Sequence, residues 1–375
     1  MPQTKRKAPE KKKTSAVKSK TSAKANLKKK AQPKKAAAKQ KPKAASKANQ
    51  TLRKRTNVKS LPIAPGKPWA IVVNPNSGAG KTAKSWNDLE PLLRRHLTDF
   101  DVYFTTAKKH ATELTREAIS RGSRHIVAIG GDGTISEVVS GFFTEKCEPD
   151  KRAQKVSLGI IASGSGSDLI KTLKIPKEPE LAVRNLLSGT PRKMDAGKVT
   201  YRNFAGKTES RIFINIAEVG IGGEVIEILD KQGKGAGGWL SYQLATLRGL
   251  LKYKNKEMTV QLDKQTPITA RYNGVVVANG RFFGSGMMVA PGADVQDALF
   301  DVVELSEMSR TAMILKAGSI RKGTHIKDER VKVSRAKKVI VLCEERALME
   351  LDGELCGTCP VEFQVLPAAI SVIMP

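Results

Sequence analysis

The sequence predicts an α/β fold, in which a parallel sheet covered by helices precedes a β-rich second domain. Between residues 69 and 176, short apolar runs of strand length alternate with segments of helical pattern. After Gly189 this alternation ends, and short segments rich in Val and Ile are separated by glycine, proline and charged turns. The strands of the first part are almost continuously apolar, which indicates a parallel sheet that is buried on both faces.

The first domain is expected to contain four strands, each followed by a helix. The strands are predicted at residues 69–74, 101–105, 125–129 and 156–162. The helices are predicted at 82–96, at 111–121, at 134–142, and from 168 to a break at Pro176. Ligands of such sheets bind beyond the carboxyl ends of the strands. Three glycine-containing loops, at 76–80, 130–134 and 163–167, leave that edge, so we expect the functional site there.

The second domain is predicted to consist mostly of β-sheet. Its expected strands lie at residues 211–217, 257–262, 274–278, 302–305, 331–333 and 338–342. One helical segment, at 238–254, interrupts them. It places four leucines on one face of the helix, namely Leu240, Leu244, Leu247 and Leu251.

The charge of the chain is concentrated at its N-terminus. The 375 residues include 66 Lys and Arg against 36 Asp and Glu, which gives +30. Residues 1–60 contain 22 of the basic residues and one acid, Glu10, so this arm carries +21 and the remaining 315 residues carry +9. The arm has no aromatic residue and too little apolar surface to offset the entropy of an ordered chain. We expect it to be disordered.

These observations divide the chain into segments. We expect the arm and a proline hinge at 1–68, an α/β domain at 69–192, and a β-rich domain at 193–364. The last apolar run, at 365–375, is expected to return to the α/β domain as a strand.

Composition also excludes several classes of protein. No apolar run approaches the roughly 18 residues that a membrane-spanning helix needs. The N-terminus is positive but lacks the apolar segment of a secretory signal. We therefore expect a cytoplasmic protein in a reducing compartment. Its four cysteines, Cys147, Cys343, Cys356 and Cys359, are expected to be thiols rather than a disulfide framework.

Two of the glycine-containing loops have the composition of an anion site. The loop at 77–82 ends like a P-loop, but Pro75 stands where that motif needs a glycine, so it is either a looser phosphate-facing loop or an ordinary turn. The loop at 130–134 has three glycines around Asp132 and precedes a helix, which favours close approach of an anion. A carboxylate beside phosphates is repelled by them, so Asp132 is expected to bind a cation such as Mg²⁺ or a hydroxyl group. The alternative is that Asp132 only caps the helix.

These motifs resemble the diacylglycerol kinase catalytic-domain family, which includes bacterial lipid kinases and the sphingosine and ceramide kinases. The resemblance rests on Asn74-Pro75 with Ser77-Gly78, GGDGTISEVVSG at 130–141, the loop 164–168 with Ile175-Pro176, Asp195, Gly197, residues 291–305, Asp352-Gly353-Glu354 and Pro367. It covers about residues 69–375. Ser167 stands where the family usually has Asn, and Ala298 where its metal loop usually has Gly.

The resemblance implies a kinase that transfers the γ-phosphate of ATP to a hydroxyl of a membrane lipid, either diacylglycerol or a lipid of the sphingoid or ceramide type. It implies a nucleotide domain related to those of NAD kinase and phosphofructokinase, followed by a β-sandwich domain. It also implies the residues that surround ATP, which are Asn74, Ser77, Gly78, Thr105, Gly130, Gly131, Asp132, Gly133, Thr134, Glu137 and Ser165.

The same resemblance implies the catalytic and metal-binding residues. Glu354 is expected to be the general base and Asp132 to hold Mg²⁺ and water or the substrate hydroxyl, although the sphingosine kinase branch gives the base role to the aspartate of the glycine loop. A structural Mg²⁺ site is implied with the Asp297 side chain and the carbonyl groups of Asp294 and Leu299 as ligands. The leucine-bearing helix at 238–254 is then either core, a wall of the acyl-chain cleft, or a face that touches the membrane.

Partners follow from the basic arm. Residues 1–60 suit an anionic membrane surface, which would hold the enzyme peripherally at the inner face of the membrane. They equally suit nucleic acid, bound without sequence choice. A kinase of a soluble substrate, of the NAD kinase type, is the enzymatic alternative. The sequence leaves the oligomeric state open, a homodimer included. Cys356 and Cys359 are expected to be small residues of a β turn; a zinc site with Cys343 and His325, or a redox switch, is the alternative.

Overall fold

The computed structural model describes residues 67–97, 99–164, 166–232, 244, 247–249 and 251–375. The basic arm with most of its hinge, Ser165 in the third loop, and most of the helix expected at 238–254 lie outside the described residues. Of the expected leucine stripe, Leu244, Leu247 and Leu251 are described, and each side chain is more than two-fifths exposed.

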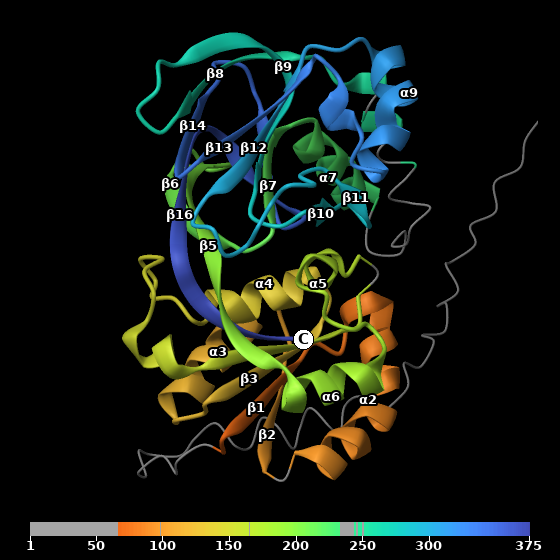
Figure 1. The fold of residues 1–375 in the computed structure, drawn as a ribbon, viewed down its shortest axis with the longest axis vertical. Helices are drawn as coiled ribbons and strands as arrows, with labels where there is room; N and C mark the ends of the chain where they lie inside the picture. Colours follow the sequence, from red (N-terminus) through yellow and green to blue (C-terminus); the bar gives the residue numbers. More distant parts are fainter. Residues whose placement is uncertain (1–66, 98, 165, 233–243, 245–246, 250) are drawn as a thin grey trace, which may run out of the picture. The chain divides into compact units, whose positions relative to one another are not determined.

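The first lobe is a parallel sheet flanked by helices (Figure 1). Its strands lie in the order β2-β1-β3-β4, and their bounds are β1 (Trp69–Val73), β2 (Phe100–Phe104), β3 (His125–Gly130) and β4 (Ser157–Ala162). The helices are α2 (Ser77–His96), α3 (His110–Ser120), α4 (Asp132–Ser140), η1 (Lys151–Lys155), α5 (Asp168–Leu173) and α6 (Pro179–Ser188).

Both faces of this sheet are buried, as the continuously apolar strands predict. Ala70 and Val72 of β1 pack into one apolar cluster, and Ile71 and Val73 pack into another. The two clusters lie on opposite sides of the sheet because successive side chains of a strand point to opposite faces.

The second lobe is formed mainly by antiparallel strands. Their bounds are β5 (Thr190–Asn203), β6 (Thr208–Phe213), β7 (Ile216–Gly220), β8 (Lys256–Leu262), β9 (Ile268–Ala278), β10 (Phe282–Phe283), β11 (Met287–Met288), β12 (Phe300–Ser306), β13 (Val331–Ala336), β14 (Lys338–Leu342), β15 (Leu348–Leu351) and β16 (Glu354–Met374). Three helical segments accompany them, α7 (Ile221–Gln232), α9 (Arg310–Arg321) and η3 (His325–Lys327).

Two long strands, β5 and β16, run through both lobes (Figure 1). They pair with each other in antiparallel register, from Gly357 opposite Asn203 to Met374 opposite Thr190. At its C-terminal end β16 also pairs in parallel with β4, where Ser371 lies opposite Ser157. The expected boundary between residues 192 and 193 therefore falls inside β5, and no linker separates the lobes at that point.

The structure differs from the expected elements at several places, including helix α6, which follows the expected break at Pro176. The single strand expected at 211–217 is two strands, β6 and β7, because the chain turns at Ile214 and Asn215. Helices α7 and α9 were not expected from the pattern. The segment 190–203, which contains polar and charged residues throughout, forms β5 because it pairs with β16 along its whole length.

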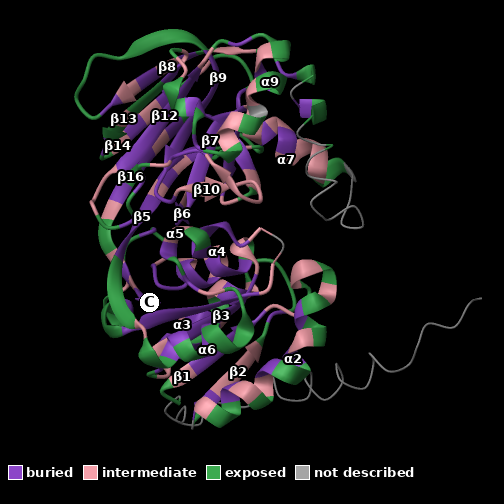
Figure 2. Cartoon of the chain, turned by 45° about the vertical axis from the view of Figure 1, so that its right-hand side comes forward, coloured by how far each residue is buried: buried purple, intermediate pink, exposed green. Residues whose placement is uncertain are grey.

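Burial follows the two lobes (Figure 2). The second lobe has its own apolar cluster, which includes Phe213, Phe300 and Phe363, and Cys356 and Cys359 pack into it as free thiols. Within the described residues, the structure has no helix that is both long enough and apolar enough to cross a membrane.

Candidate functional site

Three loops meet at the carboxyl edge of the parallel sheet, after β1, β3 and β4. A Cβ atom added to Gly164 would lie 2.5 Å from the Cα atom of Gly131, and one added to Gly78 would lie 2.8 Å from the carbonyl oxygen of Ser163. The hydroxyl groups of Thr82 and Ser163 are 2.6 Å apart. Only glycine permits these backbones to approach so closely, and Gly78 also has a positive φ of 61°.

Most of the residues expected around the nucleotide lie along these loops. The Asn74 side-chain amide donates to the Thr134 hydroxyl at 2.9 Å, which ties the first loop to the start of α4. Thr105 follows β2 and donates its backbone N–H to Val73 at 2.9 Å. The Ser77 hydroxyl lies close to Gly131, where an added Cβ would be 3.1 Å away. Ser165 falls outside the described residues.

Asp132 is the first residue of α4 and points towards the third loop. Its Oδ1 atom accepts backbone N–H groups from Asp168 at 2.9 Å and Leu169 at 3.3 Å. A Cβ added to Gly166 would lie 2.8 Å from Oδ2, so glycine leaves room for this oxygen. Burial, followed by the nearby charge of Asp168, raises the pKa of Asp132.

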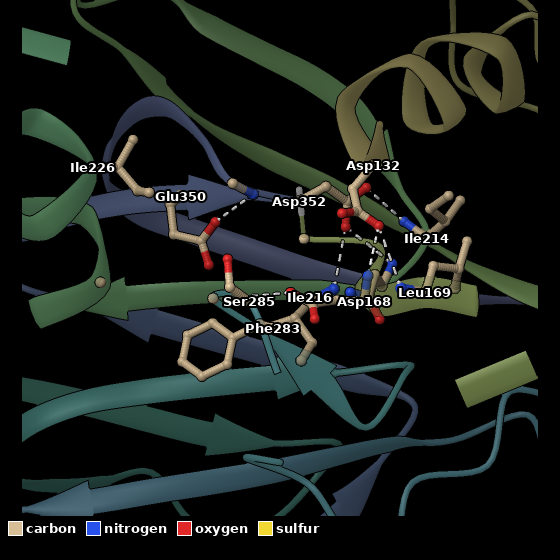
Figure 3. Close-up of a pocket in the computed structure, with 15 residues that line it drawn as sticks. Asp132, Asp168, Leu169, Ile214, Ile216, Ile226, Phe283, Ser285, Glu350 and Asp352 are labelled. Atoms are coloured by element: carbon tan, nitrogen blue, oxygen red, sulfur yellow. Dashed lines mark hydrogen bonds between the residues drawn. The ribbon is translucent and has the colours of Figure 1, made fainter. Parts of the chain in front are cut away.

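A first cavity opens at Asp132 (Figure 3). It is lined by residues of both lobes, namely Asp132, Gly166, Asp168, Leu169, Ile214, Asn215, Ile216, Gly222, Ile226, Phe283, Gly284, Ser285, Glu350, Asp352 and Gly353. Asp168 is held in place, because its carboxylate receives the Lys171 ammonium at 2.6 Å and the Ser285 backbone N–H at 2.8 Å. Four carboxyl groups therefore face one cavity, and Asp168 is paired with Lys171.

Asp352, in the Asp-Gly-Glu segment, has a structural position. The turn between β15 and β16 gives Asp352 and Gly353 positive φ angles of 48° and 84°. In this conformation the buried carboxylate accepts the backbone N–H groups of Ile214, Asn215 and Ile216 at 3.0 to 3.1 Å, together with the Ser136 hydroxyl at 2.9 Å. It thus joins α4 of the first lobe to the turn between β6 and β7.

Glu354, the expected general base, lines a different cavity from Asp132. This second cavity contains Gly133, Glu137, Arg211 and Glu354 among its lining residues. Arg211 approaches the Glu354 carboxylate at 3.0 Å and Lys108 at 3.3 Å. Burial alone would raise the pKa of Glu354, but the two cations outweigh burial and lower it. The structure does not bring the two expected catalytic carboxylates into one cavity.

Glu137 lines the same cavity as Glu354 and supports the fold of the first lobe. Its carboxylate accepts the Ala111 backbone N–H at 3.3 Å, and its carbonyl oxygen accepts the Thr112 hydroxyl at 2.7 Å. These bonds satisfy donors in the first turn of α3, which lacks a side-chain cap of its own. Glu137 therefore positions α3 against α4.

The loop expected to bind Mg²⁺ has its acidic side chain occupied by protein groups. Asp297 accepts the Leu299 backbone N–H at 3.0 Å and forms an ion pair with Arg335, which also contacts Asp301 at 3.3 Å. Asp294 accepts the Gln296 backbone N–H at 3.0 Å. In the described part of the chain, no three His, Cys, Asp or Glu side chains group as a metal site would require. In this structure Arg335 therefore neutralises the Asp297 carboxylate that was expected to bind Mg²⁺.

Ala298, in the same loop, has a φ of 59°, the left-handed conformation that favours glycine. Its backbone N–H donates to Asp195 at 2.8 Å, and the other oxygen of Asp195 accepts the Ala368 backbone N–H at 2.7 Å. Asp195 thereby holds two residues with left-handed backbone, since Ala368, at an irregularity of β16, also has a positive φ of 49°.

A third, apolar cavity adjoins the first, and the two share Gly222 and Phe283. Its apolar lining is Ile221, Val225, Phe283, Met287, Val289, Leu305, Met308, Met313, Ile320 and Val331. Glu218 and Asn273 lie at one part of its wall, and the ion pair of Lys316 and Asp328 at another. Methionine side chains adapt readily to irregular apolar ligands.

Several residues of the site carry no signal in the sequence. Arg211 and Lys108, which hold Glu354, are two among many basic residues. Glu350 and Glu218 stand in β-strand patterns without a motif around them. The one indication in the sequence is that Glu350 lies two residues before the Asp-Gly-Glu segment, which places it near the site.

Comparisons with known proteins agree with this architecture. The family model described as the diacylglycerol kinase catalytic domain matches residues 68–199, and the YegS C-terminal NAD kinase beta sandwich-like domain matches residues 216–374. The chain is 29% identical over 317 residues to the diacylglycerol kinase of Bacillus subtilis strain 168, covering 81% of this chain and 95% of that protein. It is 27% identical over 308 residues to the diacylglycerol kinase of Mycobacterium tuberculosis strain H37Rv, with 81% and 94% coverage.

Solved structures from Bacillus anthracis strain Sterne share the fold. One superposes with a TM-score of 0.68 at 22% identity, covering 86% of this chain and 98% of the other. A diacylglycerol kinase from that strain gives a TM-score of 0.60 at 18% identity, with 82% and 96% coverage. The expected α/β domain followed by a β-sandwich domain is confirmed. The first lobe therefore matches the diacylglycerol kinase catalytic domain, the second matches the YegS C-terminal domain, and the chain is a lipid kinase.

Proposed function

We propose that this enzyme transfers the γ-phosphate of ATP to a hydroxyl group of a membrane lipid, either a diacylglycerol or a lipid of the sphingoid or ceramide type. One observation carries the proposal. The carboxylate of Asp132 lies between the three glycine-containing loops and a cavity that continues into an apolar one. Phosphate groups, a proton acceptor and an alkyl chain can therefore be held side by side.

The three loops suit the phosphates of ATP. Their glycines expose backbone N–H groups, and α4 begins at this point with its positive dipole end. When bound with the nucleotide, Mg²⁺ would spread the negative charge that develops during transfer. Asp168 is the carboxylate near these loops that would hold such an ion.

We assign the role of general base to Asp132 rather than to Glu354. Among the described residues, two backbone N–H groups donate to Oδ1 of Asp132. The Oδ2 atom accepts no hydrogen bond from these residues and faces the cavity. Its raised pKa makes this carboxylate a better proton acceptor near neutral pH. Glu354 is a poorer acceptor, because Arg211 and Lys108 lower its pKa and occupy its oxygens. Glu354 instead holds two cations beside the second cavity.

The transfer step conserves atoms and charge. The lipid hydroxyl gives its proton to Oδ2 of Asp132, and its oxygen forms a bond to the γ-phosphorus. The bond between the γ-phosphorus and the bridging oxygen breaks, and ADP leaves. The lipid phosphate is the second product, and Asp132 returns its proton to water.

Substitution distinguishes the two carboxylates. Asp132→Asn should lower kcat by a factor on the order of 10² to 10⁴ with little change in the KM for ATP. Glu354→Gln should act mainly on KM, because it releases Arg211 and Lys108. Steady-state kinetics with labelled ATP measure both. Wild-type kcat in Asp132→Asn, together with a large loss of kcat in Glu354→Gln, would return the base role to Glu354.

The lipid is identified by transfer of labelled phosphate over a panel of diacylglycerol, sphingosine, ceramide and undecaprenol, with NAD as the soluble control. Labelling of one or more lipids supports the proposal. Labelling of NAD alone would identify a soluble-substrate kinase, and no labelling at all would refute the kinase assignment.

We further propose that the basic arm holds the enzyme at the anionic inner face of a membrane, with the protein otherwise in the cytoplasm. Each Lys or Arg near an anionic leaflet contributes about 1 kcal/mol. Helix α9, which lines the apolar cavity through Met313 and Ile320, also presents Leu315, whose side chain is 84% exposed. An apolar contact of this kind suits a helix that approaches a bilayer.

Co-sedimentation with vesicles of phosphatidylglycerol and phosphatidylcholine tests the arm. Binding should fall steeply with salt and be lost on deletion of residues 1–60. The same two proteins in a gel shift with duplex DNA test the alternative. Nucleic acid would be favoured as the partner of the arm by two results together. Vesicle binding would be unchanged by salt and by the deletion, and the full-length protein would bind DNA.

A further inference from the structure

Two buried glutamates face each other across neighbouring strands of the second lobe. Glu218 lies on β7 and Glu350 on β15, and the antiparallel register places them directly opposite one another. Their side chains are 2% and 3% exposed, respectively. Like charges in such a pair repel, and burying them removes the water that would screen the repulsion.

The surrounding chain makes room for the two carboxyl groups but gives them no cation. The Gly222 backbone N–H donates to Oε1 of Glu218 at 2.8 Å, and that of Gly353 donates to Oε2 of Glu350 at 2.8 Å. A Cβ added to Gly222 would lie 2.2 Å from Oε2 of Glu218, and one added to Gly274 would lie 2.7 Å from Oε1. Among the described residues, no Lys, Arg or His pairs with either glutamate, and no hydrogen bond reaches their second oxygens.

Both glutamates have raised pKa values. Burial raises the pKa of Glu218 to about 7, and burial together with Glu218 raises the pKa of Glu350 well above its usual range. Asp352 adds a further negative charge near Glu350, and burial and the charge of Glu218 raise the pKa of the nearby Tyr253 hydroxyl. Tyr253 adds no positive charge, so the pair has a net negative charge when one proton is bound.

The pair stands where the two cavities meet. Glu350 lines the first cavity together with Asp132 (Figure 3), and Glu218 lines the apolar cavity. Gly222, which donates to Glu218, belongs to both linings. A lipid with its reacting hydroxyl at Asp132 and its alkyl chain in the apolar cavity would carry its polar segment past this pair.

We propose that the Glu218–Glu350 pair binds an N–H donor of the acceptor lipid, so that the enzyme prefers a long-chain amino alcohol or its N-acyl derivative over diacylglycerol. This inference rests on the proposed lipid kinase function. A carboxyl pair with net negative charge attracts an ammonium group or an amide N–H, whose hydrogen its ionised oxygens accept, and an ester offers no N–H donor. Diacylglycerol has one hydroxyl, which is the acceptor, and otherwise presents only ester oxygens.

The test measures the full-length protein with ATP and three lipids in neutral mixed micelles at pH 7.5. Sphinganine carries an amine, ceramide an amide N–H, and dioleoylglycerol neither. The wild type should show a higher kcat/KM for at least one N–H lipid than for dioleoylglycerol. Glu218→Gln and Glu350→Gln should each lower that ratio by at least about tenfold, since a hydrogen bond to a charged group is lost.

Glu304→Gln is the matched control. Glu304 is a buried glutamate of β12 that accepts the Tyr272 hydroxyl at 3.1 Å and lines neither cavity. Its substitution should leave the lipid ratio unchanged, and circular dichroism checks that all variants are folded. Preference of the wild type for dioleoylglycerol would overturn the inference and leave the lipid kinase function intact. So would a ratio that neither glutamate variant changes. Failure to phosphorylate any lipid would instead overturn the proposed function.

Discussion

Replacing Glu218 by Gln should change how the free energy of unfolding depends on pH. The ordinary pKa of this carboxyl group is 4.5, and burial raises it to about 7 in the folded protein. A group whose folded pKa is raised stabilises the fold fully below its unfolded pKa. That contribution is lost as pH rises through the folded pKa, because the charged form is favoured only in the unfolded chain. Gln cannot ionise, so the variant lacks this loss.

The size of the effect follows from the two pKa values. Between pH 5 and pH 8 the titration of Glu218 should remove about 2.5 kcal/mol of stability from the wild type. Glu218→Gln also relieves the repulsion on Glu350, which acts in the same direction. The variant should therefore gain at least about 2 kcal/mol relative to wild type over this pH range.

Urea unfolding, followed by circular dichroism at pH 5, 6, 7 and 8, measures this difference. Glu350→Gln should show the same sign, since burial and Glu218 raise its pKa. Curves for wild type and Glu218→Gln that stay parallel to within about 0.5 kcal/mol would refute the reasoning. They would mean that the carboxyl group is hydrated or paired in the folded protein.

Three further substitutions or treatments test the site and the fold. Gly164→Ala places a Cβ 2.5 Å from the Cα atom of Gly131, so the loops must separate, and nucleotide titration should show ATP affinity lowered by about tenfold or more. Asp352→Ala removes the acceptor of three backbone N–H groups and one hydroxyl, so it should destabilise the fold by roughly 3 kcal/mol or more. A thermal unfolding midpoint equal to that of the wild type would contradict this role. Burial raises the pKa of Cys356 and Cys359 to about 12, so both thiols should react slowly with iodoacetamide at pH 8, as measured by mass spectrometry. Rapid modification would support the redox switch instead. So would an activity that differs between oxidising and reducing conditions.

The sequence was sufficient where the physical determinant is local. Continuous apolar runs predicted the strands of the first lobe, because a strand buried on both faces needs no polar alternation. Val and Ile runs similarly located β14 at 338–342, its observed bounds. The glycines at 130–134 predicted close approach of an anion, but not that Gly131 would also approach the backbone of Gly164.

The sequence was insufficient where the determinant is a distant partner. β5 is rich in polar and charged residues and becomes a strand only because β16 pairs with it. The Asp-Gly-Glu segment predicted a free carboxylate at Glu354. In the structure this carboxylate is paired with Arg211, which lies 143 positions earlier in the chain. Arg335 likewise forms an ion pair with Asp297, the acidic side chain of the loop that was expected to bind Mg²⁺.

By itself the sequence determined the family, the order of the two domains and the place of Asp132 at a strand end, since each depends on neighbours within a few residues. The tertiary structure alone decided which carboxylates share a cavity. Glu218 and Glu350 are 132 positions apart, and no motif connects them. They face each other because β7 and β15 are adjacent in the sheet, and their pKa values rise because that sheet excludes water.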